Sequence, residues 1–148
     1  MKFYIATDHT GVVIKESVKA YVISRGHEIV DLGPFSEDRV DYPDFAKKCA
    51  YSVLEDKGSF GILICGTGIG ISISANKIKG IRAGLCHDAY TASMCRAHND
   101  ANILCFGQRV VGMGVIENMI DAFCNTAFEG GRHSGRVEKI ECSFGNNF

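Results

Sequence analysis

The sequence predicts an α/β fold, in which five parallel strands form a sheet and helices cover both of its faces. Two observations lead to this fold class. Strand-like and helix-like segments alternate five times along the 148 residues, a pattern typical of parallel sheets with crossover connections. The strand-like segments are apolar throughout, as expected where helices bury both faces of a sheet. The length, and a sequence without repeats or linkers, fit a single domain over residues 1–148.

The expected strands are short apolar runs that end at glycine, proline or polar residues. These runs are residues 2–7, 27–32, 59–64, 81–86 and 102–106.

The expected helices lie between these runs. Val12, Val18 and Val22 recur at helical spacing before Gly26. Asp44 is expected to cap a helix that ends near residue 55, and residues 42–43 before it are expected to be extended because a proline restricts the residue that precedes it. Further helices are expected from the glycine-rich turn to about residue 77, and over about 87–97, 113–128 and 137–142, with turns at 98–100 and 130–136.

Charge and composition narrow the classes of partner. The formal net charge is −1, so there is no general attraction to nucleic acid or to an anionic membrane. No apolar segment approaches the roughly 20 residues that span a bilayer, and the first residues are too short for a signal peptide. We therefore expect a cytoplasmic protein. The seven cysteines are odd in number and lack C-x-x-C or zinc-ligand spacing, so neither a disulfide framework nor a zinc site is expected.

Candidate site residues follow the ends of the expected strands. Ligands of open α/β sheets bind at the carboxyl ends of the strands. Asp8 and His9 follow the first strand, Cys65 and residues 66–70 follow the third, and Arg109 follows the fifth. His98 and Asn99 stand just before the fifth strand. We expect all of these residues to meet at one rim of the sheet.

The stretch 64–78, ICGTGIGISISANKI, places three glycines in five positions after a strand. Such a turn allows close backbone approach and points N–H groups at an anion, although a tight turn without a ligand remains an alternative. A Walker P-loop would continue with Lys-Ser/Thr after the last glycine, where Ile71 and Ser72 stand. The dinucleotide pattern would need glycine, and a cysteine phosphatase arginine, at position 71.

Cys65 stands directly before this turn. Nearby N–H donors favour a thiolate, which can act as a nucleophile or a general base. The same donors can stabilise an oxyanion. Together they suit the removal of a proton next to a carbonyl, as in aldose–ketose isomerisation through an enediolate. Arg132 and Arg136 are four residues apart, so on a helix they could grip a phosphate together, or they are a solvated basic turn. Tyr42 is either a packing residue or one whose hydroxyl reaches a sugar.

Several segments together resemble the type B ribose-5-phosphate isomerases, a family that also includes galactose-6-phosphate and allose-6-phosphate isomerases. These segments are Asp8-His9-x-Gly11, Asp41-Tyr42-Pro43, ICGTGIGISISANK, GIRAGLC, HNDANILCFGQRVVG and EGGRHSGRV. The resemblance covers nearly the whole chain, in order. It implies a Rossmann-like three-layer α/β/α sandwich, no metal or cofactor, and a homodimer or dimer of dimers with shared active sites.

The resemblance also implies residue roles. Cys65 corresponds to the base that moves a proton between C2 and C1; another branch of the family uses a glutamate at the position of Ile71. His98 corresponds to the histidine that helps to open the furanose ring, with Asp8 near the ring oxygens and Thr67 hydrogen-bonding near Cys65 or the sugar. The other expected contacts are Gly66, Gly68, Ile69 and Gly70 with the enediolate oxygen, His9, Arg132 and Arg136 with the phosphate, and Asn99 and Arg109 from the neighbouring subunit. Thr10 departs from the small residue common in the family.

The expected reaction is the interconversion of D-ribose 5-phosphate and D-ribulose 5-phosphate. Two alternatives remain open from the sequence. A six-carbon substrate, such as allose 6-phosphate or galactose 6-phosphate, would need a deeper pocket. A phosphate- or nucleotide-binding module without catalysis would need only the glycine turn.

Overall fold

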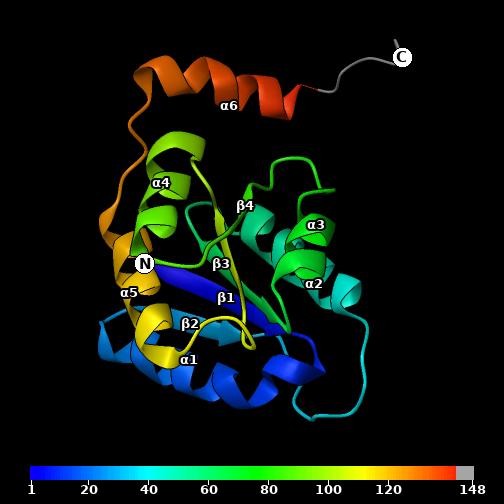
Figure 1. Ribbon diagram of the computed structural model, residues 1–148. Helices are drawn as coiled ribbons and strands as arrows, with labels where there is room; N and C mark the ends of the chain where they lie inside the picture. Colours follow the sequence, from blue (N-terminus) through cyan, green and yellow to red (C-terminus); the bar gives the residue numbers. More distant parts are fainter. Residues whose placement is uncertain (143–148) are drawn as a thin grey trace.

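The structure is a computed structural model that describes residues 1–142 (Figure 1). Its sheet has five parallel strands in the order β2-β1-β3-β5-β4, which confirms the predicted fold class. The strands are β1 (Lys2–Thr7), β2 (Glu28–Asp31), β3 (Phe60–Cys65), β4 (Ala83–Leu85) and β5 (Ile103–Gly107).

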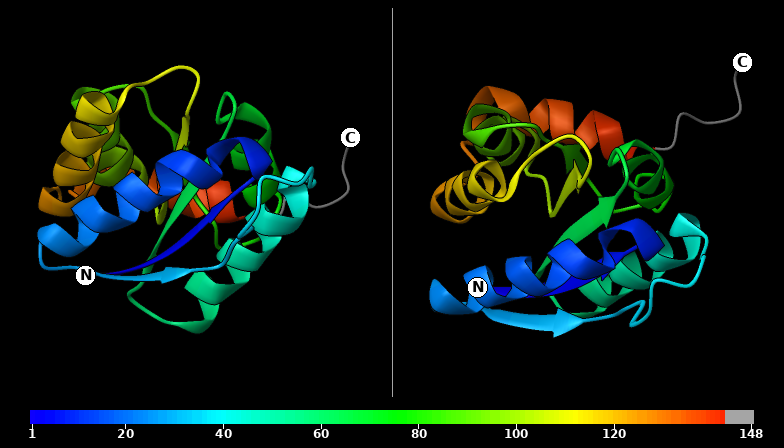
Figure 2. Two further views of the ribbon diagram at one scale, coloured as in Figure 1. Left: turned by 90° about the horizontal axis from the view of Figure 1, so that it is seen from below. Right: turned by 60° about the horizontal axis from the view of Figure 1, so that its bottom comes forward.

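Helices form a layer on each face of the sheet (Figures 1 and 2). One layer contains α1 (Val12–Ser24), α4 (Ala89–Asn99) and α5 (Met113–Asn125), and the other contains α2 (Tyr42–Glu55) and α3 (Ile69–Ala75). The 3-10 turn η1 (His9–Gly11) precedes α1, and η2 (Gly131–His133) leads into α6 (Ser134–Glu141).

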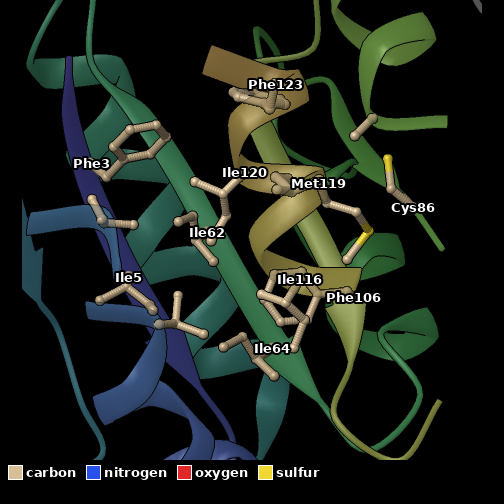
Figure 3. Close-up of a cluster of buried hydrophobic side chains, with 14 of the residues drawn as sticks. Phe3, Ile5, Ile62, Ile64, Cys86, Phe106, Ile116, Met119, Ile120 and Phe123 are labelled. Carbon is tan, nitrogen blue, oxygen red and sulfur yellow. The ribbon is translucent and has the colours of Figure 1, made fainter. Parts of the chain in front are cut away.

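Neighbouring side chains of the central strands point to opposite faces of the sheet, as the pleat requires. Ile62 and Ile64 of β3 enter the core under α1 and α5, where Ile116 and Phe123 pack on them (Figure 3). Leu63 and Cys65 enter the core on the other face, under α2 and α3. The side chain of Cys65, the last residue of β3, therefore points toward the layer that contains α2 and α3.

The structure corrects element boundaries that bear on the site. Helix α2 begins at Tyr42, with Asp41 rather than Asp44 at its N-cap, so residues 42–43 are helical and not extended. Pro43 fits there because its fixed φ suits a first helical turn, where an N–H would have no partner. His98 and Asn99 form the last turn of α4 rather than a loop, and the helix ends at Asp100, which has φ 46°.

Other differences are smaller. Strands β2 and β4 are shorter than predicted, and β3 extends to Cys65. Helix α5 ends at Asn125 rather than near residue 128. Arg132 lies in η2 and Arg136 in α6, which begins at Ser134, three residues before the predicted start.

Within residues 1–142, no helix is both long and apolar enough to cross a membrane.

Candidate active site

A pocket of about 590 Å³ lies at the carboxyl edge of the sheet, where the turns after β1, β3 and β5 meet the start of α2. All of its lining residues except Thr10 and Arg39 belong to the predicted site. The lining consists of Asp8, His9, Thr10, Arg39, Tyr42, Cys65, Gly66, Thr67, Ile69, Gly70 and Arg109. The predicted convergence of segments at this rim is therefore observed for three strand ends.

Cys65 is the last residue of β3 and is only 5% exposed. The Gly68 amide donates a hydrogen bond to Cys65 Sγ at 3.1 Å, and an N–H donor stabilises negative charge on sulfur. The Gln108 amide donates to the Cys65 carbonyl oxygen at 3.0 Å. Hydrogen bonds thus hold both the sulfur and the carbonyl oxygen of Cys65, and the residue lines the pocket.

The glycine turn packs tightly on β5. A Cβ at Gly107 would lie 2.4 Å from the carbonyl carbon of Thr67, and one at Gly68, whose φ is +78°, would lie 2.6 Å from backbone of Phe106. Only glycine fits at such distances. Within residues 1–142, the amides of Gly66 and Thr67 donate no hydrogen bond. These two N–H groups beside the thiol are therefore available to an oxyanion.

Tyr42 and Thr67 border the turn. A Cβ at Gly70 would lie 2.6 Å from Cζ and 3.0 Å from the hydroxyl oxygen of Tyr42, so the phenol lies directly over Gly70. Thr67 Oγ1 accepts a hydrogen bond from the Ile69 amide at 3.3 Å at the start of α3. The Thr67 hydroxyl thus shapes the turn, and the Tyr42 hydroxyl sits at the pocket wall.

Asp8 and His9 are positioned by their neighbours. The Asp8 carboxylate accepts hydrogen bonds from the amide of Thr10 at 2.9 Å and from its hydroxyl at 2.6 Å. Thr10, the departure from the family pattern, thereby orients a site carboxylate. The Val40 amide donates to His9 Nδ1 at 3.4 Å, which leaves Nε2 of the neutral ring as a donor.

Arg109 lines the pocket of its own chain. Its amide donates to the Gly66 carbonyl oxygen at 3.1 Å, and its guanidinium lies close above Gly66, where a Cβ would be 3.6 Å from Nη1. Arg109 therefore lies at the pocket of its own chain, and its contribution to the site of a neighbouring subunit stays a prediction.

Comparison with known proteins identifies the family. The model of the ribose/galactose isomerase family matches residues 3–140. The chain belongs to this family. It is 46% identical to ribose-5-phosphate isomerase B of Escherichia coli over 139 residues, which are 94% of this chain and 93% of that protein.

Solved structures agree with this assignment. Ribose-5-phosphate isomerase B of Clostridium thermocellum has a TM-score of 0.92 at 47% identity, with 95% of each chain covered. The type B enzyme of Trypanosoma brucei has a TM-score of 0.91 at 49% identity, with 95% of this chain and 96% of that chain covered. The prediction of an enzyme, rather than a phosphate-binding module without catalysis, is confirmed.

Five predicted site residues lie outside the pocket lining. One of them, Gly68, belongs to the glycine turn, and its amide already donates to Cys65 Sγ. The other four are His98, Asn99, Arg132 and Arg136. Helix α4 runs back along the sheet, so its last turn lies at the amino ends of the strands. The Arg82 guanidinium, one residue before β4, donates to the Asn99 carbonyl oxygen at 3.1 Å. Within one chain, His98 and Asn99 therefore lie at the rim opposite Cys65, and the prediction of a single rim is wrong for them.

His98 belongs to a second cluster near η2. Its ring stacks on that of His133, with centroids 4.2 Å apart and planes 11° apart, and Arg132 Nε donates to His133 Nε2 at 3.3 Å. Burial lowers the pKa of His133, and the nearby charges of His98 and Arg132 lower it further. The neutral form of His133 is thus favoured, which matches its role as acceptor for Arg132.

The same cluster could offer metal ligands. Ligand atoms of His98, Glu129 and His133 lie within 4.8 Å of one another. However, His133 Nε2 accepts a hydrogen bond from Arg132 Nε, and the guanidinium adds positive charge to the cluster. The spacing of histidines and cysteines in the sequence gave no signal of this cluster, because its members come together only through the stacking of η2 on α4.

The remaining cysteines do not line the pocket. Burial raises the pKa of Cys49 to about 12 and the pKa of Cys105 well above its usual range. Cys86 Sγ lies 3.7 Å from Cys95 Sγ in the core. Cys65 is thus the thiol that combines access to the pocket with neighbouring amide donors.

Proposed function

We propose that this protein interconverts D-ribose 5-phosphate and D-ribulose 5-phosphate through a cis-enediolate. The observation that carries the proposal is the Cys65 sulfur at the pocket wall, beside the amides of Gly66 and Thr67 that have no acceptor within residues 1–142. The E. coli and C. thermocellum relatives that carry the name ribose-5-phosphate isomerase B support the choice of a five-carbon substrate.

In the proposed reaction, the Cys65 thiolate removes the proton from C2 of the open-chain aldose. The electron pair forms the C1–C2 double bond, and the carbonyl π electrons move onto O1. The Gly66 and Thr67 amides stabilise that oxyanion, as preorganised N–H donors do. A proton passes from O2 to O1, and Cys65 returns its proton to C1, which yields the ketose. Asp8, oriented by Thr10, faces the sugar oxygens.

We further propose that the active site is shared between two subunits of a homodimer or of a dimer of dimers. The pocket of one chain contains His9 as its histidine, whereas His98, Asn99, Arg132 and Arg136 lie at the opposite rim. In the proposal, the second cluster of one subunit faces the Cys65 pocket of its partner. His98 then assists ring opening, and Arg132 and Arg136 contact the phosphate.

The substrate is tested by measuring kcat/KM side by side for ribose 5-phosphate, allose 6-phosphate and galactose 6-phosphate. We expect the highest value for ribose 5-phosphate, with activity that persists in the presence of EDTA. A higher value for a six-carbon sugar would replace the proposed substrate, and no turnover of any of the three would reject the function.

The shared site is tested by mixing two variants that each turn over ring-closed ribose 5-phosphate poorly. Cys65→Ala and His98→Asn are unfolded and refolded together in equal amounts. About a quarter of the wild-type rate is expected, because half of the dimers are mixed and each mixed dimer holds one intact site. If each chain carried a complete site, mixing would give no more than the average of the two variants.

A further inference from the structure

The pocket contains a cation, Arg39, that is not among the predicted site residues. Arg39 lies in the loop between β2 and α2 and is exposed, with its side chain at the pocket wall. Within residues 1–142, no carboxylate lies within 4.0 Å of its guanidinium. The carboxylate of the adjacent Asp38 is engaged by the Ser36 hydroxyl at 2.9 Å.

The loop that carries Arg39 is anchored at both ends. At its start, the buried Lys15 donates from Nζ to the Pro34 carbonyl oxygen at 2.6 Å, and the Thr7 amide donates to the Gly33 carbonyl oxygen at 3.1 Å. At its end, the Val40 amide donates to His9 Nδ1. Arg39 thus precedes a residue that is hydrogen-bonded to a site histidine, so its backbone is held beside His9.

The charge of the pocket favours a dianion. Arg39 and Arg109 are its two guanidinium groups, and Asp8 is its one carboxylate among the described lining residues. That carboxylate already accepts two hydrogen bonds from Thr10. His9 Nε2 adds a further donor. A phosphate carries close to two negative charges at neutral pH and suits the planar fork of arginine.

We infer that Arg39 binds the substrate phosphate together with His9, from the same chain as Cys65; this inference rests on the proposed function. Of the two guanidinium groups in the pocket, that of Arg109 lies above Gly66, whereas Arg39 directly precedes the residue whose amide donates to His9. Arg39 is therefore the pocket cation placed to share the phosphate with His9. The span from Arg39 to Cys65 then sets which length of sugar phosphate places its C2 proton at the sulfur.

The test compares Arg39→Ala, Arg39→Lys and Lys47→Ala, the last of which removes a positive charge from an exposed residue of α2 outside the pocket. Arg39→Ala is expected to raise both KM for ribose 5-phosphate and the inhibition constant of inorganic phosphate about tenfold, with kcat changed less than about threefold, because one charge-assisted hydrogen bond is lost. Arg39→Lys should recover part of each loss, and Lys47→Ala should leave both constants within about twofold.

Two results would overturn the inference: constants for Arg39→Ala within twofold of wild type, or a loss confined to kcat. Calorimetric titration with inorganic phosphate separates this outcome from failure of the proposed function. If the wild-type protein does not turn over ribose 5-phosphate but Arg39→Ala still weakens phosphate binding, the anion contact stands and the reaction is wrong. If the wild-type protein is active and Arg39→Ala matches it, the reaction stands and the contact is wrong.

Discussion

Replacing Lys15 by methionine tests how the fold holds the loop that carries Arg39. Lys15 is 1% exposed. Its Nζ donates to Asp31 Oδ1 at 2.9 Å and to the Pro34 carbonyl oxygen at 2.6 Å, and it lies 4.9 Å from the centroid of the Phe35 ring. One buried ammonium thus joins α1, the end of β2 and the start of the loop.

The expected loss in the free energy of unfolding follows from the groups that lose a hydrogen-bond partner. Breaking a fully buried ion pair costs about 3–5 kcal/mol. Asp31 keeps two other donors, the Lys19 ammonium at 2.8 Å and the Gly33 amide at 2.9 Å, so it contributes less to this cost. The Pro34 carbonyl oxygen loses its side-chain donor, which costs about 1–3 kcal/mol. Methionine retains the apolar stem. We expect a loss of about 2–3 kcal/mol, or roughly 5–10 °C in Tm for a domain of this size.

The assay is urea unfolding followed by circular dichroism, at one protein concentration for all variants because assembly contributes to stability. Lys47→Met is the matched control, since that side chain is exposed and makes no ion pair within residues 1–142. It should shift the unfolding free energy by less than about 0.5 kcal/mol. A loss below about 1 kcal/mol for Lys15→Met would refute the reasoning, because the buried ammonium would then add little beyond its own desolvation.

Three further predictions concern the turn, the second cluster and acid stability. Gly107→Ala, whose Cβ would lie 2.4 Å from the Thr67 backbone, should displace the glycine turn and lower kcat/KM at least about a hundredfold, whereas Gly114→Ala, with nothing within 4 Å, should leave it unchanged. Burial and nearby charge lower the pKa of His133 in the folded protein, so the unfolded chain binds the proton more readily. The contribution of His133 to stability should therefore be fully present above about pH 6.5 and be lost as the pH falls through the folded-state pKa. Between pH 7 and pH 5, the urea midpoint of His133→Gln should change less than that of the wild-type protein. An equal change of the midpoint in both proteins would contradict this. Burial raises the pKa of Asp31, but hydrogen bonds from Lys19, Lys15 and the Gly33 amide outweigh it and lower the pKa overall. The contribution of Asp31 to stability is therefore present above about pH 4 and lost below that pH. In the same urea assay, Asp31→Asn should lose less stability on acidification than the wild-type protein.

The parts of the site that the sequence predicts best are those set by strand ends. An apolar run followed by glycines defines the end of β3, so Cys65 and its turn are placed correctly. The prediction is wrong for His98 because this residue stands just before β5. A residue that precedes a parallel strand lies at its amino end, opposite the residues that follow the other strands, and α4 carries His98 to that edge.

Arg39 and Lys15 show what a sequence pattern leaves out. Arg39 lies in an irregular loop with no periodicity, and its place beside His9 depends on contacts from Lys15 and Val40. Lys15 occupies an ordinary helical position, and its burial depends on the distant end of β2. The predicted start of α2 is wrong because a proline has two opposing effects: it restricts the residue before it, and it suits a first helical turn. The second effect decides the start of α2.

The central claim is that Cys65 moves a proton between C2 and C1 of ribose 5-phosphate. Nuclear magnetic resonance in D2O follows it directly, because a thiol that holds the proton exchanges part of it with solvent. Wild-type protein should introduce deuterium at C2 of the aldose and C1 of the ketose. Cys65→Ala should slow this exchange at least about a thousandfold, as loss of a positioned base does, while it still binds inorganic phosphate as tightly as wild type. Exchange by Cys65→Ala at a rate near that of wild type would contradict the account.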